Sequence, residues 1–179
     1  MKNTAQDIRF FAEAMPQLQD YLLSNELFWP LSGSLPRLTP GCILLTMARM
    51  SVFQPVEAQR LGIQLKVVRA KWHSAWEKKV IREIGNRTRL WAQFLSDYKN
   101  SPEQNVASYA NEVRSRTILQ LLLKEYLVAP EKPDLDQCDS ILRSCLVTGA
   151  FLWDAELQVV FPADDFWFLY GKLFEKPFA

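Results

Sequence analysis

The side chains that most often perform catalysis or bind metals are few in this sequence and lie far apart. His73 is the only histidine, and the three cysteines are Cys42, Cys138 and Cys145. Recognisable zinc sites place their ligands in pairs at short spacing, and this set does not supply such pairs. We therefore expect no metal site, and we interpret the cysteines as small buried side chains in a reduced protein.

His73 lies between two tryptophans and four residues before Glu77. That spacing permits an ordinary contact between side chains on one helix. No serine or cysteine in a recognisable motif accompanies the imidazole as a nucleophile. We therefore interpret His73 as structural rather than catalytic.

Two groups of carboxylates could bind a cation or transfer a proton: the set Asp134, Asp136 and Asp139, and the pair Asp164–Asp165. Adjacent aspartates in front of an apolar run are more often helix starts, because negative charge is favourable in the first turn of a helix. The six glycines are isolated, so neither a phosphate-binding loop nor a dinucleotide fingerprint is present. The sequence predicts a protein that is not an enzyme, with no catalytic residue, no cofactor and no small-molecule substrate.

Positive charge is concentrated in the middle of the chain, where residues 57–91 contain nine Lys or Arg and three Glu. Apolar side chains recur there at the spacing of one helix face: Leu61, Leu65, Val68, Trp72 and Trp76. On a single helix, five cations would fall within about 40° of one another beside that face: Arg60, Lys71, Lys78, Arg82 and Arg89. Gly85 and Asn86 offer a helix stop, and Arg89 leaves this basic row if the helix ends there.

The positive charge in the middle is opposed by a net negative charge further along. Residues 92–179 carry eight basic and thirteen acidic side chains, whereas residues 1–56 carry four of each. The basic row could pair with the acidic half of the same molecule or of a second copy. Without such pairing it could bind an acidic protein surface, or the phosphates of a nucleic acid through counterion release. A plain solvated helix face is the third interpretation.

Aromatic residues are concentrated at the C-terminus, with nine of them in residues 151–179. Residues 166–170 are apolar around the whole helical turn, so one helix face cannot bury all of them. Because aromatic side chains are enriched in interface cores, we expect five of them to contact a partner: Trp153, Phe166, Trp167, Phe168 and Tyr170. The alternative is that the neighbouring hairpin and helices cover these rings.

The composition is that of an ordinary globular protein. Apolar residues make up 49% and charged residues 23% of the 179 residues, and the net charge is +1. No run approaches the roughly eighteen apolar residues of a membrane span, since the candidate run at residues 41–50 includes Arg49. The N-terminus lacks the basic start and apolar core of a signal peptide. We therefore expect a cytoplasmic protein that does not enter a membrane.

Periodicity and helix-capping signals predict the order of the elements. Helices are expected over residues 4–24, 40–54, 57–91, 101–128, 135–147 and 164–174. Thr39–Pro40 and Ser101–Pro102 are the clearest starts, because a capping side chain precedes a proline at the first helical position. Pro16 predicts a kink in the first helix, or its division into two. Residues 129–134 contain two prolines and are the expected hinge.

The period changes near the C-terminus. Alternating apolar residues predict one β-hairpin with its turn at residues 154–156: Phe151, Trp153, Leu157, Val159 and Phe161. The order helix, helix, hairpin is similar in arrangement to a winged helix, in which the second helix enters the DNA major groove. Asp136 and Asp139 would repel DNA from that helix, so a wing here would serve packing or contact with a protein.

The sequence therefore predicts a mainly α fold, an irregular multi-helix domain with one small C-terminal β-hairpin. We divide it into residues 1–100, which contain the basic helix, and residues 101–179, which contain the hairpin and the aromatic tail. These parts form one compact domain or two closely packed subdomains. The function that the sequence favours is a non-enzymatic interaction or accessory subunit of a larger assembly, which binds a protein partner or itself. Nucleic-acid binding through residues 57–91 is the alternative.

Overall fold

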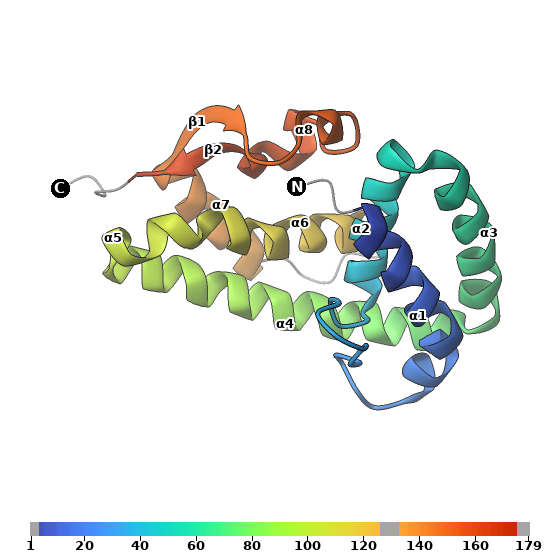
Figure 1. Cartoon of the computed structure of the whole chain (residues 1–179). Helices are drawn as coiled ribbons and strands as arrows, with labels where there is room; N and C mark the ends of the chain where they lie inside the picture. The colour runs from blue at the N-terminus through green and yellow to red at the C-terminus, as the bar shows by residue number, and fades with distance from the viewer. Residues whose placement is uncertain (1–3, 126–132, 175–179) are drawn as a thin grey trace. The chain divides into compact units, whose positions relative to one another are not determined.

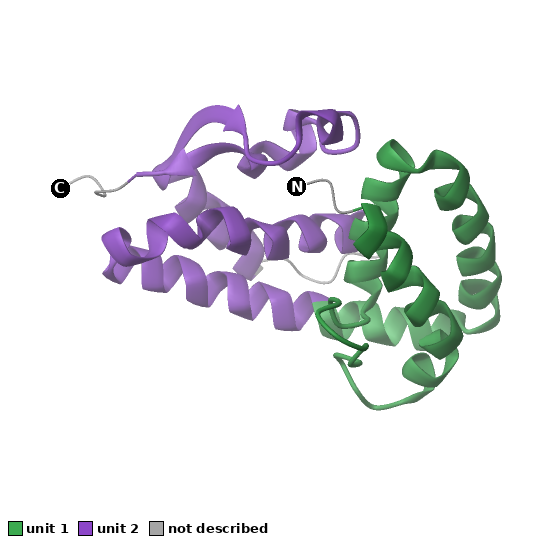
Figure 2. Cartoon of the chain, viewed as in Figure 1, with its two compact units in different colours: residues 1–83 green, residues 84–179 purple. Residues whose placement is uncertain are grey.

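The computed structural model describes residues 4–125 and 133–174, and this part of the chain is mainly helical with a small antiparallel hairpin near its end (Figure 1). The predicted fold class is confirmed. The chain divides into two compact units, residues 1–83 and residues 84–179 (Figure 2). The division falls inside a helix, whereas the sequence suggested a boundary after residue 100.

The first unit begins with α1 (Thr4–Leu23), which runs through Pro16 as one helix rather than as two. The loop that follows is fastened back to α1. The Trp29 indole nitrogen donates to Gln17 Oε1 at 2.8 Å, and Ser32 donates to the Glu13 carboxylate from both its backbone and its hydroxyl. Both hydrogen bonds from Ser32 lower the pKa of Glu13, and the bond from the hydroxyl has the larger effect.

The start of α2 (Pro40–Phe53) confirms the prediction from Thr39–Pro40, because the Thr39 hydroxyl accepts from the Cys42 amide at 3.1 Å. A second cap comes from far along the chain. The buried Glu83 carboxylate accepts from the Thr39 hydroxyl at 2.7 Å and from the Gly41 amide at 2.8 Å. A carboxylate at this end of a helix satisfies an amide that has no partner within the helix.

The prediction of one continuous basic helix is wrong. Residues 55–100 form two helices, α3 (Pro55–Lys71) and α4 (His73–Asn100), because the backbone leaves helical geometry at Trp72, with φ −116° and ψ 36°. One straight helix of that length would extend about 70 Å, more than twice the width of a unit of this size. The turn at Trp72 lets Leu65 of α3 and Trp76 of α4 both be buried in the first unit.

The helix stop suggested by Gly85 and Asn86 does not form, because α4 continues through both residues. A glycine inside a helix costs about 1 kcal/mol, whereas burying a large apolar side chain contributes about 1.5–3 kcal/mol. Ile84 and Trp91 are both buried on either side of this position. Their burial outweighs the weak local signal.

In the second unit α4 lies beside a helical segment that the sequence predicted as one helix. The segment consists of α5 (Pro102–Asn105), the 3-10 turn η1 (Val106–Ser108) and α6 (Tyr109–Glu125). The Trp91 and Tyr109 rings, 6.4 Å apart, join α4 to α6. Residues 126–128 of the predicted helix and most of the expected hinge lie outside the described residues. The next helix, α7 (Pro133–Cys145), confirms the predicted helix over residues 135–145, whereas residues 146 and 147 of that prediction belong to a strand.

The hairpin has a different position from the predicted one. Its strands are β1 (Leu146–Phe151) and β2 (Tyr170–Leu173), with Leu146 opposite Leu173. Between them lie η2 (Ala155–Val159), α8 (Ala163–Phe166) and η3 (Trp167–Leu169). The predicted second strand is therefore mostly a 3-10 turn, and the predicted last helix is mostly β2 and short turns. Leu157 is buried and Val159 is 76% exposed, so these two residues do not share one face as alternate residues of a strand would.

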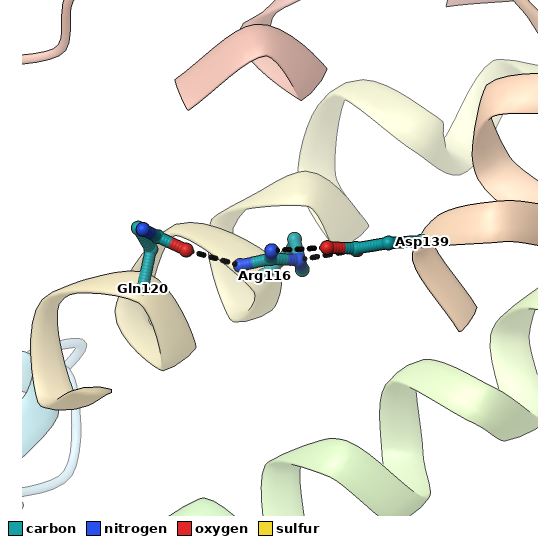
Figure 3. A network of polar contacts seen from close by, with 3 residues as sticks. All are labelled: Arg116, Gln120 and Asp139. Atoms are coloured by element: carbon teal, nitrogen blue, oxygen red, sulfur yellow. Dashed lines mark hydrogen bonds and ion pairs between the residues drawn. The ribbon is translucent and has the colours of Figure 1, made fainter. Parts of the chain in front are cut away.

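Arg116 of α6 is buried in the second unit, and Figure 3 shows its hydrogen bonds with Gln120 and Asp139. Its guanidinium donates two hydrogen bonds to Asp139 of α7, at 2.9 and 2.7 Å, and one to Gln120 at 3.1 Å. The same guanidinium lies 4.4 Å from the centre of the Phe168 ring of η3. The planar donor group thus connects the helices and the segment before β2.

Candidate functional site

The structure brings three of the five predicted basic-row residues together and separates the other two. Lys71, at the end of α3, and Lys78 and Arg82, on α4, line one open pocket of the first unit. Arg60 is paired with Glu57 at 2.8 Å elsewhere on α3, and Arg89 lies on the part of α4 that belongs to the second unit. The five cations therefore do not form one row, because the helix breaks at Trp72.

The pocket has a volume of about 730 Å³ and lies where the end of α1 meets the start of α4. Its cationic lining is Lys71, Lys78, Lys79 and Arg82, and the His73 side chain lies beside them. No Asp or Glu lines it within the described residues. Two carboxylates interact with lining residues: Glu77 pairs with His73 at 3.4 Å, and the charge of Glu26 acts on Lys79. The pocket therefore carries an excess of positive charge.

Lys79 lines the pocket, is buried and stabilises the fold. Its ammonium donates to the Ser24 carbonyl at 3.0 Å, to the Ser24 hydroxyl at 3.3 Å and to the Glu26 carbonyl, and lies 4.3 Å from the centre of the Tyr21 ring. Burial lowers the pKa of Lys79, the positive charge of Arg82 lowers it further, and Glu26 acts in the opposite direction. With its donors engaged, this lysine holds the turn after α1.

The other cations of the pocket are exposed and only weakly engaged. Arg82 donates one hydrogen bond, to the Asn25 carbonyl at 3.0 Å, which uses one of its five donors. Lys71 lies 5.3 Å from the centre of the Trp72 ring. Lys78 makes no hydrogen bond or ion pair with any described residue. These three side chains can therefore contact an anion from outside the unit.

The pocket also presents apolar surface. Leu23, at the end of α1, is 56% exposed, and Ile81, on α4, is 43% exposed. Trp72, which also lines the pocket, is half-buried. The pocket therefore combines exposed aliphatic side chains with cationic ones.

Two of the five predicted aromatic interface residues are inaccessible, and this corrects the prediction. Phe166 and Phe168 are 1% and 0% exposed, because α6 packs against α8 and β2 and covers them. Arg116 and Lys124 of α6 lie over these rings, with the Lys124 ammonium 5.0 Å from the centre of the Phe166 ring. The alternative interpretation, coverage by neighbouring elements, applies to both.

The remaining three aromatic residues are half-buried and contact their own unit. Trp153 packs edge-on against Phe161 at 5.3 Å, and Tyr170 donates a hydrogen bond to the Phe161 carbonyl at 2.8 Å. The Arg143 guanidinium lies 3.8 Å from the centre of the Trp167 ring. These contacts give each ring a role in the second unit and leave only part of each accessible.

The residues considered for catalysis are spread over both units. His73 is largely exposed and pairs with Glu77, while Asp139 is engaged by Arg116 and Asp165 by Lys124 at 2.6 Å. No three His, Cys, Asp or Glu side chains within residues 4–125 and 133–174 are grouped so that they could hold a metal ion. Cys42, Cys138 and Cys145 are buried and unbridged, and burial raises the pKa of the last two thiols.

Comparison with known proteins adds no assignment, because the chain matches no protein-family model, no curated protein and no solved structure. None of the helices in the described part of the chain combines the length and the apolar character that crossing a membrane requires.

Sequence reasoning missed the apolar half of the pocket. Leu23 appeared as part of the first helix, and Ile81 as one of many residues on a basic helix. The adjacent Lys78 and Lys79 gave no sign that one is exposed and the other buried. Only the packing of α1 against α4, more than forty residues apart in sequence, defines these roles.

Proposed function

We propose that this protein is a non-enzymatic interaction module, an accessory subunit that binds an acidic, partly apolar segment of a partner protein in the α1–α4 pocket. One observation carries the proposal: Lys71, Lys78 and Arg82 line a pocket that also presents Leu23 and Ile81 and in which no described residue contributes a carboxylate. Acidic side chains of the segment would contact the cations, and its apolar side chains would cover the leucine and the isoleucine.

The apolar surface favours a protein segment over a nucleic acid as the occupant. A phosphodiester backbone contacts cations, and being charged it does not pack against exposed aliphatic side chains. Single strands stack their bases on aromatic rings, and Trp72, the aromatic residue of the pocket, has Lys71 against its ring. Nucleic acid is the competing occupant that the experiment must exclude.

The test is fluorescence anisotropy with a labelled synthetic 20-residue peptide that carries leucines at helical spacing and glutamates elsewhere. The substituted protein is Lys71→Glu/Lys78→Glu, and its matched control is Arg89→Glu/Lys99→Glu, which changes two exposed cations outside the pocket and gives the same net charge. Circular dichroism and thermal melting verify that both variants fold.

We expect the pocket variant to weaken binding of the peptide and the control variant to leave it nearly unchanged. An exposed ion pair contributes about 0.2–1 kcal/mol, and reversal replaces attraction by repulsion, so two reversals cost roughly 1–3 kcal/mol, or about 5- to 150-fold in Kd. Equal weakening by both variants would reduce the effect to net charge and overturn the proposal. Tighter, pocket-dependent binding of a 20-nucleotide oligothymidine than of the peptide would favour the nucleic-acid alternative instead.

A further inference from the structure

The α3 helix has apolar side chains on two opposite faces. Its inner face buries Ala58, Leu61 and Leu65, and beside them a Cβ on Gly62 would make an ordinary van der Waals contact with Met47 Cε of α2 at 3.5 Å. At 100° per residue these three side chains lie within about 60° of one another. This face is the part of α3 that holds it in the first unit.

The outer face carries three exposed β-branched residues. Val56, Ile63 and Val67 are 79%, 61% and 65% exposed, and their positions on the helix lie within about 40° of one another and roughly opposite the inner face. We name these three residues the α3 stripe. A helix that is apolar on two opposite sides is normally covered on both. Here the described residues cover only one.

The stripe leads directly to the pocket. Val67 and Lys71 are four residues apart on α3, so their side chains are neighbours, and Lys71 is part of the pocket lining. From Val56 to Val67 the stripe extends about 17 Å, which corresponds to about three turns of a second helix lying alongside. An occupant of the pocket that continues as a helix therefore meets this surface.

The charges beside the stripe select the occupant. Arg60, Lys66 and Lys71 flank it, and Glu57, which pairs with Arg60, is the single carboxylate of α3. Two copies of α3 facing each other would bring like charges together, which opposes pairing of this face with itself. A helix with an apolar face and acidic flanks is complementary to both the stripe and its borders.

We infer that the α3 stripe and the α1–α4 pocket form one surface, and that its occupant is an amphipathic, acid-flanked helix of a partner protein whose apolar face covers Val56, Ile63 and Val67. This inference rests on the proposed function, because it assigns the form of the segment that the pocket binds. The pocket supplies the charge contacts, and the stripe supplies the apolar contacts that continue from them.

The experiment uses the full chain with the stripe substituted as Ile63→Ser/Val67→Ser. The matched control is Leu90→Ser/Val159→Ser, which removes two aliphatic side chains of the second unit that are 52% and 76% exposed. Two labelled probes are compared: the 20-residue glutamate–leucine peptide, and the same peptide with every leucine replaced by serine. Light scattering reports the oligomeric state of each protein.

We expect the stripe variant to weaken binding of the leucine-containing peptide about tenfold or more, because two aliphatic side chains no longer become buried, and the control variant to leave it unchanged. Binding of the serine-containing peptide, which depends on charge, stays the same in the stripe variant. The Lys71→Glu/Lys78→Glu variant weakens both peptides.

The outcomes separate the inference from the proposal on which it rests. If the stripe variant binds the leucine-containing peptide as well as its control does, while the lysine variant binds weakly, the inference fails and the pocket proposal stands. If the lysine variant also binds normally, both fail. If the unsubstituted protein is a dimer that the stripe substitutions dissociate, the occupant is a second copy and the inference is overturned.

Discussion

Removing either partner of the Arg116–Asp139 pair should destabilise the second unit by unequal amounts. The Arg116 side chain is 3% exposed, whereas that of Asp139 is 21% exposed. In Asp139→Leu the guanidinium stays buried without its counter-charge, so water cannot replace the lost partner. In Arg116→Met the carboxylate is left behind, and water can reach about a fifth of it.

The magnitudes follow from that asymmetry. Leaving an uncompensated buried charge costs about 3–5 kcal/mol, which is the expected loss for Asp139→Leu. For Arg116→Met the loss is discounted for the exposure of Asp139 to about 2–3 kcal/mol, which includes the cation–π contact with Phe168. The double variant should recover part of the loss, because no unpaired charge remains in it.

Urea unfolding of the four proteins, followed by circular dichroism, measures these differences as a double-mutant cycle. The expected order of stability is unsubstituted, then double variant, then Arg116→Met, then Asp139→Leu. A loss below about 0.5 kcal/mol for both single variants would place the pair among surface ion pairs of little consequence and refute the reasoning. Additive losses in the double variant would refute the coupling.

Two further predictions concern the hairpin and the buried tyrosine. In Gly171→Ala the new Cβ would meet the Val147 carbonyl oxygen at 2.3 Å, so the strands must separate locally. We expect the free energy of unfolding to fall by about 1–3 kcal/mol. Thermal melting checks this against Gly149→Ala, where the atom nearest to the new Cβ is 3.8 Å away. Burial raises the pKa of Tyr109, whose hydroxyl donates to the Phe168 carbonyl at 2.6 Å. The unfolded chain therefore loses this proton first, near its ordinary value of 10.0, and the contribution to stability is present below that pH and is lost as the pH rises above it. Tyr109→Phe should lower stability at pH 7 by about 1–2 kcal/mol and reduce the fall in unfolding free energy above pH 10, measured by urea unfolding across pH; an unchanged alkaline slope would contradict it.

Local signals predicted the parts of the fold that local physics controls. Thr39 caps α2 as expected, since its hydroxyl satisfies an amide three residues away and requires no distant partner. The mainly α class followed from the periodicity of the long apolar stripes. The capping pattern at Ser101 predicted where α5 begins, although the Ser101 side chain makes no capping hydrogen bond there. Helix starts were thus more accurate than the contacts expected of them.

Predictions failed where distant packing outweighs the local pattern. Nothing near Trp72 distinguishes it from Trp76, yet Trp72 ends α3 whereas Trp76 is buried within α4. Gly85 and Asn86 resembled a helix end by their residue types alone. The helix continues because Trp91 is buried against Tyr109, which lies eighteen residues further along the chain and gives no signal near Gly85. The two strands of the hairpin are separated by residues 152–169, a distance over which alternation in one window has no predictive value.

The candidate site depends on the same limitation. Charge counting found the cations of the pocket, because exposed lysines and arginines keep their positions whether or not the helix is continuous. It could not separate Lys78 from Lys79, since α1 decides which of the two is covered. The apolar spacing of Val56, Ile63 and Val67 was present in the sequence beside the stronger pattern of Leu61 and Leu65.

When a helix has two apolar faces, its apolar residues show no single clear period. The sequence then indicates only the longer of the two rows of apolar residues, which here is the row that includes Leu61 and Leu65. The structure assigns the inner face of α3 to the core of the first unit and leaves Ile63 and its neighbours exposed. Exposed aliphatic side chains contribute nothing to the stability of the free protein, so serine at these positions should leave its melting temperature nearly unchanged. A substitution on an interaction surface weakens peptide binding without changing the stability of the fold, whereas a substitution in the core lowers that stability. The α3 helix allows this comparison, because it carries exposed residues such as Ile63 and buried ones such as Leu61.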